Sequence, residues 1–367
     1  MKTRSDSGPV LDKGDVLLEA RGLSKGFPGV WEHLILDKLD FDVRSGEVHT
    51  LLGENGAGKT VIANILSGYY EKTEGEIWVK GKLVHFRSPR EGLAHGIAMV
   101  HQELMLVPAF TVAENIMVGL DAPLFSYGIA GVEKRIQRLV ERYGLQVDPK
   151  ARVEDLSAGQ QQRVEILKVL FHEPEVLLLD EPTSLLTPSE ADQLFVVLRA
   201  MADDGKGIVF ISHKMREVFA VSDRVTVLKL GKTQGTCQIA ETNEDELTRR
   251  TFGETVPDYM ERPEVAHEEL ALNTIEMVPS GLEKKPNSQG ISLKIRCGEI
   301  MGLAGVSGNG QTELIEAVTG LVPPASGEIW ILNADMTGRT PKEFIEHGVA
   351  HIPERRREIG IVEQMYV

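Results

Sequence analysis

The chain has 367 residues, enough for two domains of ordinary size that each bury a core. Its formal net charge of −15, from 40 Lys and Arg against 55 Asp and Glu, argues against a general surface for nucleic acid or anionic lipid. The polar tail 1–15 lacks the apolar core of a signal peptide, and no run approaches 18 consecutive apolar residues. We therefore expect a cytosolic protein, with Cys237 and Cys297 as reduced thiols rather than metal ligands.

Apolar runs of β type alternate with helical stretches along the chain. The expected strands are 47–52, 76–79, 97–101, 175–180, 207–212 and 224–230, and the expected helices are 58–67, 132–143, 160–171 and 189–204. Strands separated by helices indicate an α/β core with a largely parallel sheet.

The sequence contains an internal repeat with an offset of 252 residues. The shift places "SGEVHTLLGENGAGKT" (45–60) over "CGEIMGLAGVSGNGQT" (297–312), and 18 of the 57 positions in 46–102 are identical without a gap. We interpret this register as a duplicated domain.

The repeat sets the expected domain limits. After the tail comes a first domain at 16–254, then a polar, acidic and Pro-containing linker at 255–270. Residues 271–367 match only the front part of the first domain, so we expect a partial second copy there.

The stretch "GENGAGKT" (53–60) matches the phosphate-loop pattern at every fixed position. It follows an expected strand and opens an expected helix, where backbone N–H groups and the helix dipole favour an anion. Lys59 is expected to reach the β- and γ-phosphates of a nucleotide, and Thr60 to bind Mg²⁺. The residues expected to bind nucleotide here are Gly53, Glu54, Asn55, Gly56, Ala57, Gly58, Lys59 and Thr60.

The stretch "EVLLLDEPTS" (175–184) is an apolar strand that ends in two acids. Asp180 is placed to hold Mg²⁺, and Glu181 to orient or deprotonate an attacking water. Two acids at a strand end are also found in ordinary solvated turns, but their position about 120 residues after the phosphate loop favours a catalytic pair.

The stretch "LSAGQQQRVEI" (156–166) places Ser157, Gly159 and Gln160 at the start of an expected helix, a second candidate anion site. It resembles the signature sequence of ATP-binding-cassette (ABC) ATPases, usually Leu-Ser-Gly-Gly-Gln, with Ala158 in place of one glycine. Taken by itself, the stretch also fits a serine cap on an ordinary helix.

Three further motifs match this family in order. Gln102 in "MVHQEL" resembles the glutamine that contacts Mg²⁺ or water and senses a transmembrane partner. His213 in "ISHK" resembles the histidine that bonds the γ-phosphate, and Phe27 in "SKGFPGV" the aromatic residue that stacks on adenine. The resemblance implies an α/β fold, with a RecA-like P-loop NTPase core, an antiparallel β-subdomain and a helical subdomain at about 104–163, followed by a partial second cassette.

Within the family, the chain is most similar to twin-cassette importers of ribose, galactose and nucleosides. The stretches that carry this resemblance include "DEPTSLLTPSE", in which Thr187 replaces a frequent aspartate, and "GVSGNGQTELIEAVTG" and "HGVAHIPERRR" in the second copy. The resemblance implies a subunit that hydrolyses ATP with Mg²⁺ to power import of a simple sugar or nucleoside. It also implies a peripheral position on the cytoplasmic face of the membrane.

The implied partners are transmembrane permease subunits, a second ABC domain and, indirectly, a periplasmic or extracellular solute-binding protein, with no nucleic acid. In the family, nucleotide lies between two cassettes, so Ser157 and Gly159 would serve the opposite nucleotide, held by residues 305–312. The sequence has no second signature, acid pair or switch histidine after residue 312. We therefore expect either pairing of two molecules through their first cassettes, or a shortened chain, natural or artificial, with slow turnover.

Two other functions stay open at this point. One is a non-catalytic regulatory protein, which the incomplete second copy favours. The other is a soluble twin-cassette factor that acts on ribosomes, but such proteins carry a long and often basic linker, whereas 255–270 is short and acidic.

The second phosphate loop keeps its glycines at 305, 308 and 310 and its Thr312 but has Gln311 where the first has Lys59. Glu354 stands opposite Gln102 in the alignment. Because neutral Gln brings no charge to a γ-phosphate, we expect this loop to bind nucleotide more weakly or without hydrolysis; the alternative is a purely structural copy.

Overall fold

The computed structural model describes residues 14–27, 34–120, 128–253, 269–282, 289–305, 309–353 and 360–362. The chain divides into two compact units, 1–257 and 258–367, and each is considered by itself. Among the described residues, no helix is both long and apolar enough to cross a bilayer.

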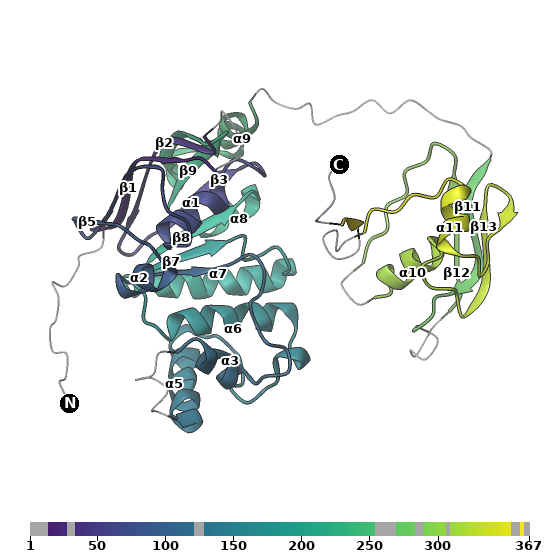
Figure 1. The fold of residues 1–367 in the computed structure, drawn as a ribbon, viewed down its shortest axis with the longest axis horizontal. Helices are drawn as coiled ribbons and strands as arrows, with labels where there is room; N and C mark the ends of the chain where they lie inside the picture. Colours follow the sequence, from purple (N-terminus) through teal and green to yellow (C-terminus); the bar gives the residue numbers. More distant parts are fainter. Residues whose placement is uncertain are drawn as a thin grey trace. The chain divides into compact units, whose positions relative to one another are not determined.

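A six-stranded sheet forms the centre of the first unit (Figure 1). Its order is β10-β9-β3-β8-β7-β6. The five strands from β9 to β6 in this order run parallel to one another, and β10 lies antiparallel to β9 at one edge. The strands are β3 (Val48–Gly53), β6 (Ile97–Val100), β7 (Val176–Asp180), β8 (Gly207–Ser212), β9 (Arg224–Lys229) and β10 (Lys232–Gln238). Every residue of β3, β7 and β8 is buried, as expected for a parallel sheet covered on both faces. The predicted parallel α/β core is confirmed.

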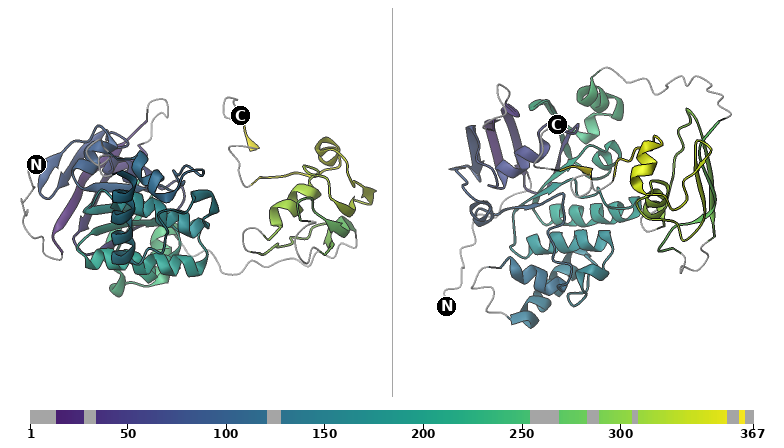
Figure 2. Two further views of the ribbon diagram at one scale, coloured as in Figure 1. Left: turned by 90° about the horizontal axis from the view of Figure 1, so that it is seen from below. Right: turned by 45° about the vertical axis from the view of Figure 1, so that its right-hand side comes forward.

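Helices surround this sheet and also form a separate group. The helices of the first unit are α1 (Lys59–Leu66), α2 (Pro89–Ala94), α3 (Val112–Val118), α5 (Gly128–Tyr143), α6 (Ala158–Leu170), α7 (Pro188–Asp203), α8 (Met215–Val221) and α9 (Glu244–Phe252), with short 3₁₀ turns at Val153–Asp155 and Ile239–Glu241. Helices α3, α5 and α6 contact one another. Figure 1 and the right-hand view of Figure 2 show them at the opposite end of the first unit from its antiparallel strands.

An antiparallel sheet in the order β2-β1-β4-β5 completes the first unit and confirms the expected antiparallel subdomain. Its strands are β1 (Val16–Lys25), β2 (Leu36–Arg44), β4 (Glu74–Val79) and β5 (Lys82–Val84). The second unit contains β11 (Leu270–Val278), β12 (Ile291–Arg296), β13 (Ser326–Ile331) and β14 (Ala334–Asp335) in the matching order β12-β11-β13-β14. Its helices α10 (Gln311–Val318) and α11 (Pro341–Glu346) lie 252 residues after α1 and α2, so the repeat in the sequence is also a repeat in structure.

The two copies fill one part of their cores by different residues. In the first copy Phe86 is buried, and a Cβ on Gly68 would lie 3.0 Å from its Cβ. In the second copy Phe344 is buried against Gly320, the counterpart of Gly68. Phe344 corresponds to Gly92 in the repeat and not to Phe86. The equivalent glycine is therefore covered by a phenylalanine in both copies, but from different positions in the sequence.

One segment of the second unit departs from the repeat. Residues 299–304 correspond to 47–52, which include most of β3, but they form no strand. Ile300 is 97% exposed, whereas its counterpart Val48 is fully buried. In the first unit β3 pairs with β8 and β9, which come more than 150 residues later in the chain. The described part of the second unit holds no counterparts of those strands, so this segment has nothing to pair with.

A buried polar network joins the two sheets of the first unit. His49 is fully buried; its Nδ1 lies 2.6 Å from the Asp42 carbonyl and its Nε2 lies 2.8 Å from the Thr226 hydroxyl. One ring nitrogen therefore donates and the other accepts, which satisfies the neutral ring. Burial, with Arg224 close by, lowers the pKa of His49 to about 4.

This network predicts a loss of stability in mild acid. The unfolded chain takes up a proton at His49 near pH 6.5 but the folded chain does not, so stability is complete above pH 6.5 and falls by roughly 3 kcal/mol as the pH drops toward 4. The free energy of unfolding is measured in urea at pH 7.5 and at pH 5, with hydrogen exchange of the β3 amides as the probe of unfolding. The fall should be clearly smaller in His49→Gln; an equal fall in both proteins would contradict the assignment.

Candidate nucleotide-binding site

The loop between β3 and α1 has a shape that only glycine permits. Gly56 and Gly58 have φ of +81° and +104°, in the left-handed region. A Cβ on Gly53 would lie 2.4 Å from the Leu228 carbonyl oxygen. Gly58 precedes α1 and offers no side chain to cap it, so the N–H groups of the first turn face an open cradle suited to an anion.

Lys59 folds back over this loop and is almost fully buried. Its Nζ donates to the carbonyl oxygens of Gly53 (2.7 Å) and Glu54 (2.9 Å). The same Nζ lies 3.9 Å from Glu181 Oε1. Burial lowers the pKa of Lys59, although the carboxylates of Glu181 and Asp180 favour its charged form. The ammonium group thus stands between the cradle and the two acids.

Glu181 is the meeting point of the predicted catalytic residues. Its Oε1 lies 3.0 Å from His213 Nδ1, and its Oε2 accepts from Gln102 Nε2 at 3.4 Å. Its φ of +44° is in the left-handed region, which costs a residue other than glycine on the order of 1 kcal/mol or more. A backbone bond from Glu181 N to the Ile211 carbonyl (3.1 Å) holds this conformation.

Asp180 has the features of a ligand for a hard cation. It is 2% exposed, and its Oδ1 has no hydrogen-bond partner. Burial raises its pKa, while a hydrogen bond with the Thr60 side chain and the charge of Lys59 lower it. A buried carboxylate oxygen beside a hydroxyl suits Mg²⁺. No three His, Cys, Asp or Glu side chains gather as a metal site within the described ranges, so nucleotide and water would have to supply further ligands.

Several of these groups line one cavity of about 430 Å³, whereas Asp180 and His213 are not among its lining residues. It is lined by Ile35, Asn55, Gly56, Gly58, Lys59, Thr60, Val61, Gln102 and Glu181. The volume is typical of a small-molecule site. The structure therefore brings together the phosphate loop, the glutamine after β6 and the acid after β7.

Phe27 lies outside this cavity lining. Its ring packs edge-on against Tyr70 at 5.4 Å, and Lys25 Nζ lies 4.7 Å from its centroid. The expected stacking on adenine stays a prediction.

The signature residues form another separate group. Ser157 caps α6 in a reciprocal box with Gln160: the Gln160 amide donates to the Ser157 hydroxyl, and the Ser157 amide donates to the Gln160 side chain. Gly159 packs against α7, because a Cβ there would lie 2.4 Å from Glu190 Oε1. None of the three signature residues is among those that line the cavity beside Lys59. Their proposed role toward an opposite nucleotide stays a prediction.

Glu217, which no sequence prediction named, holds the site together. Glu217 of α8 is buried, and its carboxylate accepts from the hydroxyls of Thr183 (2.7 and 2.8 Å) and Ser212 (2.8 Å). Thr183 follows Glu181, and Ser212 precedes His213. Glu217 therefore ties together the two loops that carry these residues. No motif marks it, because its role arises from the packing of α8 on adjacent strand ends.

The second phosphate loop keeps the shape of the first where it is described. Gly310 has φ +100° and ψ 8° before α10, close to the values of +104° and 7° at Gly58. The Gln311 amide lies over Gly305, since a Cβ there would be 2.5 Å from its Nε2. Residues 306–308 and Glu354 lie outside the described residues. The start of α10 thus keeps its geometry but has lost its positive charge.

Comparison with known proteins gives consistent matches. A family model described as ABC transporter matches residues 36–184 and 288–366. The chain is 42% identical over 332 residues to the nucleoside import ATP-binding protein NupA of Lactococcus lactis subsp. cremoris, covering 90% of this chain and 66% of that protein. It is 42% identical over 352 residues to the ribose import ATP-binding protein RbsA 1 of Rubrobacter xylanophilus, covering 96% and 69%. The chain thus spans about two thirds of the length of the curated relatives it matches.

The solved structure of cbiO1 from Clostridium perfringens, described as part of the ABC transporter complex cbiONQ, superposes with a TM-score of 0.55 at 26% identity. The match covers 64% of this chain and 94% of that one. The expected cassette fold is confirmed.

The geometry of Asp180 predicts a variant that is more stable but loses its response to metal. Because its pKa is raised, the buried charge costs stability as the pH rises through that pKa. Asp180→Asn should therefore melt at the wild-type temperature or a few degrees higher at pH 8, with a smaller gain at pH 5. The extra melting-temperature shift that MgATP gives over ATP alone should disappear.

Asp192→Asn, which changes an exposed carboxylate, is the matched control and should keep both wild-type values. If Asp180→Asn were strongly destabilised without ligand at pH 8, the assignment of an uncompensated buried charge would be wrong.

Proposed function

The chain belongs to the ABC transporter family, and on that premise we propose that it binds ATP with Mg²⁺ and hydrolyses it to power import of a simple sugar or nucleoside through a membrane permease. The observation that carries this proposal is the position of Glu181. Its carboxylate contacts both Gln102 and His213 at the rim of the cavity that Lys59 and Thr60 line.

The proposed chemistry follows from these contacts. The N–H groups of 56–60 bind the phosphates, and Lys59 exchanges its two carbonyl contacts for the β- and γ-phosphates. Thr60 and Asp180 hold the metal ion, which when bound neutralises charge on the phosphates. Glu181 orients the attacking water and accepts its proton.

Gln102 and His213 would hold the water and the γ-phosphate in line with this carboxylate. Because the signature residues lie apart from the cavity, we propose that the signature of a second cassette completes the site when nucleotide is bound. The two cassettes would then close around the bound nucleotide and separate again after hydrolysis.

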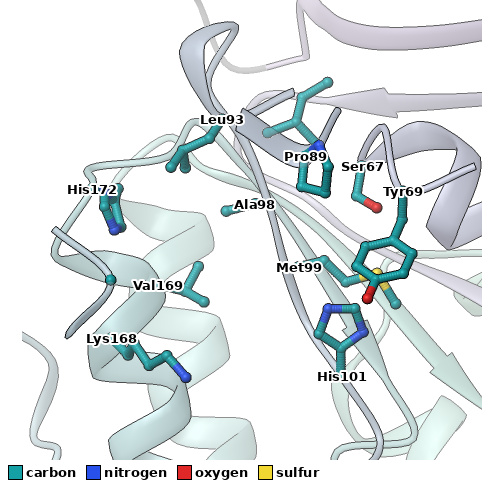
Figure 3. A pocket seen from close by; sticks show the side chains of 12 residues that line it. Ser67, Tyr69, Pro89, Leu93, Ala98, Met99, His101, Lys168, Val169 and His172 are labelled. Carbon is teal, nitrogen blue, oxygen red and sulfur yellow. The ribbon is translucent and has the colours of Figure 1, made fainter. Parts of the chain in front are cut away.

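A second cavity lies beside β6 and the residues that follow it. It measures about 200 Å³ and is lined mainly by apolar side chains from α2, β6 and α6, with Tyr69 and His101 at one side (Figure 3). Large apolar side chains are exposed nearby, among them Met105, Val107 and Val118. We propose that a permease segment with an apolar face docks here and that the chain lies on the cytoplasmic face of the membrane. A solute-binding protein would act through the permease.

The class of substrate rests on the relatives. Their names specify a nucleoside for NupA and ribose for RbsA 1. A nucleoside contains a pentose, so we propose a pentose-bearing solute or a related simple sugar.

Turnover in two variants tests the proposal. Glu181→Gln keeps the shape of the side chain but cannot accept a proton, so ATP affinity should change little while turnover falls by about 10²–10⁴-fold. Lys59→Ala should lose ATP affinity as well. Equilibrium binding of labelled ATP and phosphate release measure the two effects, with Lys342→Ala, an exposed lysine of the second unit, as the control.

The same proteins, expressed with their permease in cells, are assayed for uptake of labelled ribose, glucose and guanosine. Uptake of one of these solutes should require Glu181. Binding of ATP without turnover in any assay would favour a regulatory protein, and unchanged turnover in Glu181→Gln would contradict the assigned base.

A further inference from the structure

The segment between β6 and α3 is held by two charged side chains of α6. Glu165 Oε1 accepts a hydrogen bond from the Met105 amide at 2.6 Å, and Lys168 Nζ donates to the Met105 carbonyl at 2.8 Å. Glu165 Oε2 and Lys168 Nζ lie 3.4 Å apart. One residue thus has both of its backbone groups bound by an ion pair from a single helical turn. We call Glu165 and Lys168 the Met105 clamp.

The burial of Glu165 separates this pair from an ordinary surface ion pair. Glu165 is 5% exposed, and a carboxylate so buried is costly unless it is paired and hydrogen-bonded. The Met105 amide and the Lys168 ammonium supply those partners. Removing either therefore leaves a buried charge short of partners, and the loop has a strong preference for the observed position.

The clamp fixes the main chain and leaves the side chain outside. The Met105 side chain is 54% exposed although its backbone is bound on both sides. Two residues on, Asn115 binds Val107 in the same way, accepting from its amide (2.7 Å) and donating to its carbonyl (3.1 Å), while Val107 is 41% exposed. The segment is therefore held at its backbone while its apolar side chains stay exposed.

This segment lies between the apolar cavity and the nucleotide cavity. Lys168 lines the apolar cavity together with His101 and Val169 (Figure 3). Gln102, three residues before Met105, lines the nucleotide cavity and contacts Glu181. Lys168 is only partly buried, so a docked partner reaches it directly.

We propose that Glu165 and Lys168 are positioning residues that set where Gln102 stands relative to Glu181. The inference deepens the proposed function and rests on it for the role given to Gln102. When the clamp is lost, the Met105 backbone is released and the short stretch that carries Gln102 is no longer held in place.

The test combines hydrogen exchange of the full chain with its ATPase kinetics. Glu165→Ala and Lys168→Met should raise the exchange rate of the Met105 amide by about ten-fold or more, since the bond that protects it is lost or loosened. In both variants kcat should fall by about ten-fold while KM for ATP changes less than two-fold, because Gln102 is misplaced but the phosphate loop is intact.

Three further variants keep the test decisive. Lys168→Arg retains a donor to the Met105 carbonyl and should recover most of kcat. Glu165→Gln keeps the hydrogen-bond acceptor for the Met105 amide and the volume of the side chain. It therefore separates the effect of losing the clamp from the effect of disrupting the packing of α6. Lys150→Met removes an exposed lysine of the same subdomain and should match wild type.

Unchanged exchange at Met105, or faster exchange with unchanged kcat, would overturn the proposal. An equal loss of kcat in Lys150→Met would do the same. If the wild-type chain showed no turnover, the proposed function would fail. The exchange rate of the Gln102 side-chain amide in the same variants would then test the clamp by itself. Faster exchange supports the clamp, and no change overturns it.

Discussion

The arrangement of the first unit depends on the carboxylate of Glu181. Parallel pairing of β7 with β8 brings the chain ends that carry Glu181 and His213 to the same edge of a fully buried sheet. A bond to the Ile211 carbonyl holds Glu181 in a strained backbone conformation, which directs its side chain toward Gln102 and Lys59. Strain of this kind persists only where the surroundings fix it, and the sheet supplies that rigidity. The phosphate loop, through Lys59, and the segment after β6, through Gln102, both meet at this carboxylate.

Much of this arrangement follows from local sequence. The phosphate loop, the acids after β7 and the fixed repeat register are all local patterns, and the parallel core follows from the alternation of strands and helices. What could not be predicted depends on distant contacts. Glu217 matters because α8 packs on two strand ends. Phe344 packs on the glycine of the second copy as Phe86 does on that of the first, although the two phenylalanines do not align in the repeat. Residues 299–304 have a strand sequence, but strand pairing needs partners elsewhere in the chain.

The two copies show how little must change to alter a phosphate site. Their antiparallel sheets have the same strand order, and the glycines before α1 and α10 have nearly the same dihedral angles. At the described start of the helix the difference is the loss of a charge, from Lys59 to Gln311, after a glycine that keeps its backbone conformation. Weaker binding at the second loop therefore stays a prediction about electrostatics rather than about shape. Under the proposed function, it would leave the first unit as the one that hydrolyses ATP and the second as a regulatory or pairing module.

The most direct measurement is the structure of the Glu181→Gln chain with MgATP bound. We expect phosphates at the N-terminus of α1, with Lys59 Nζ moved from the carbonyl oxygens of Gly53 and Glu54 to the phosphate oxygens. Thr60 and Asp180 would hold the metal ion beside those phosphates. A nucleotide bound elsewhere, or phosphates in the loop with Lys59 still bonded to both carbonyls, would contradict this expectation.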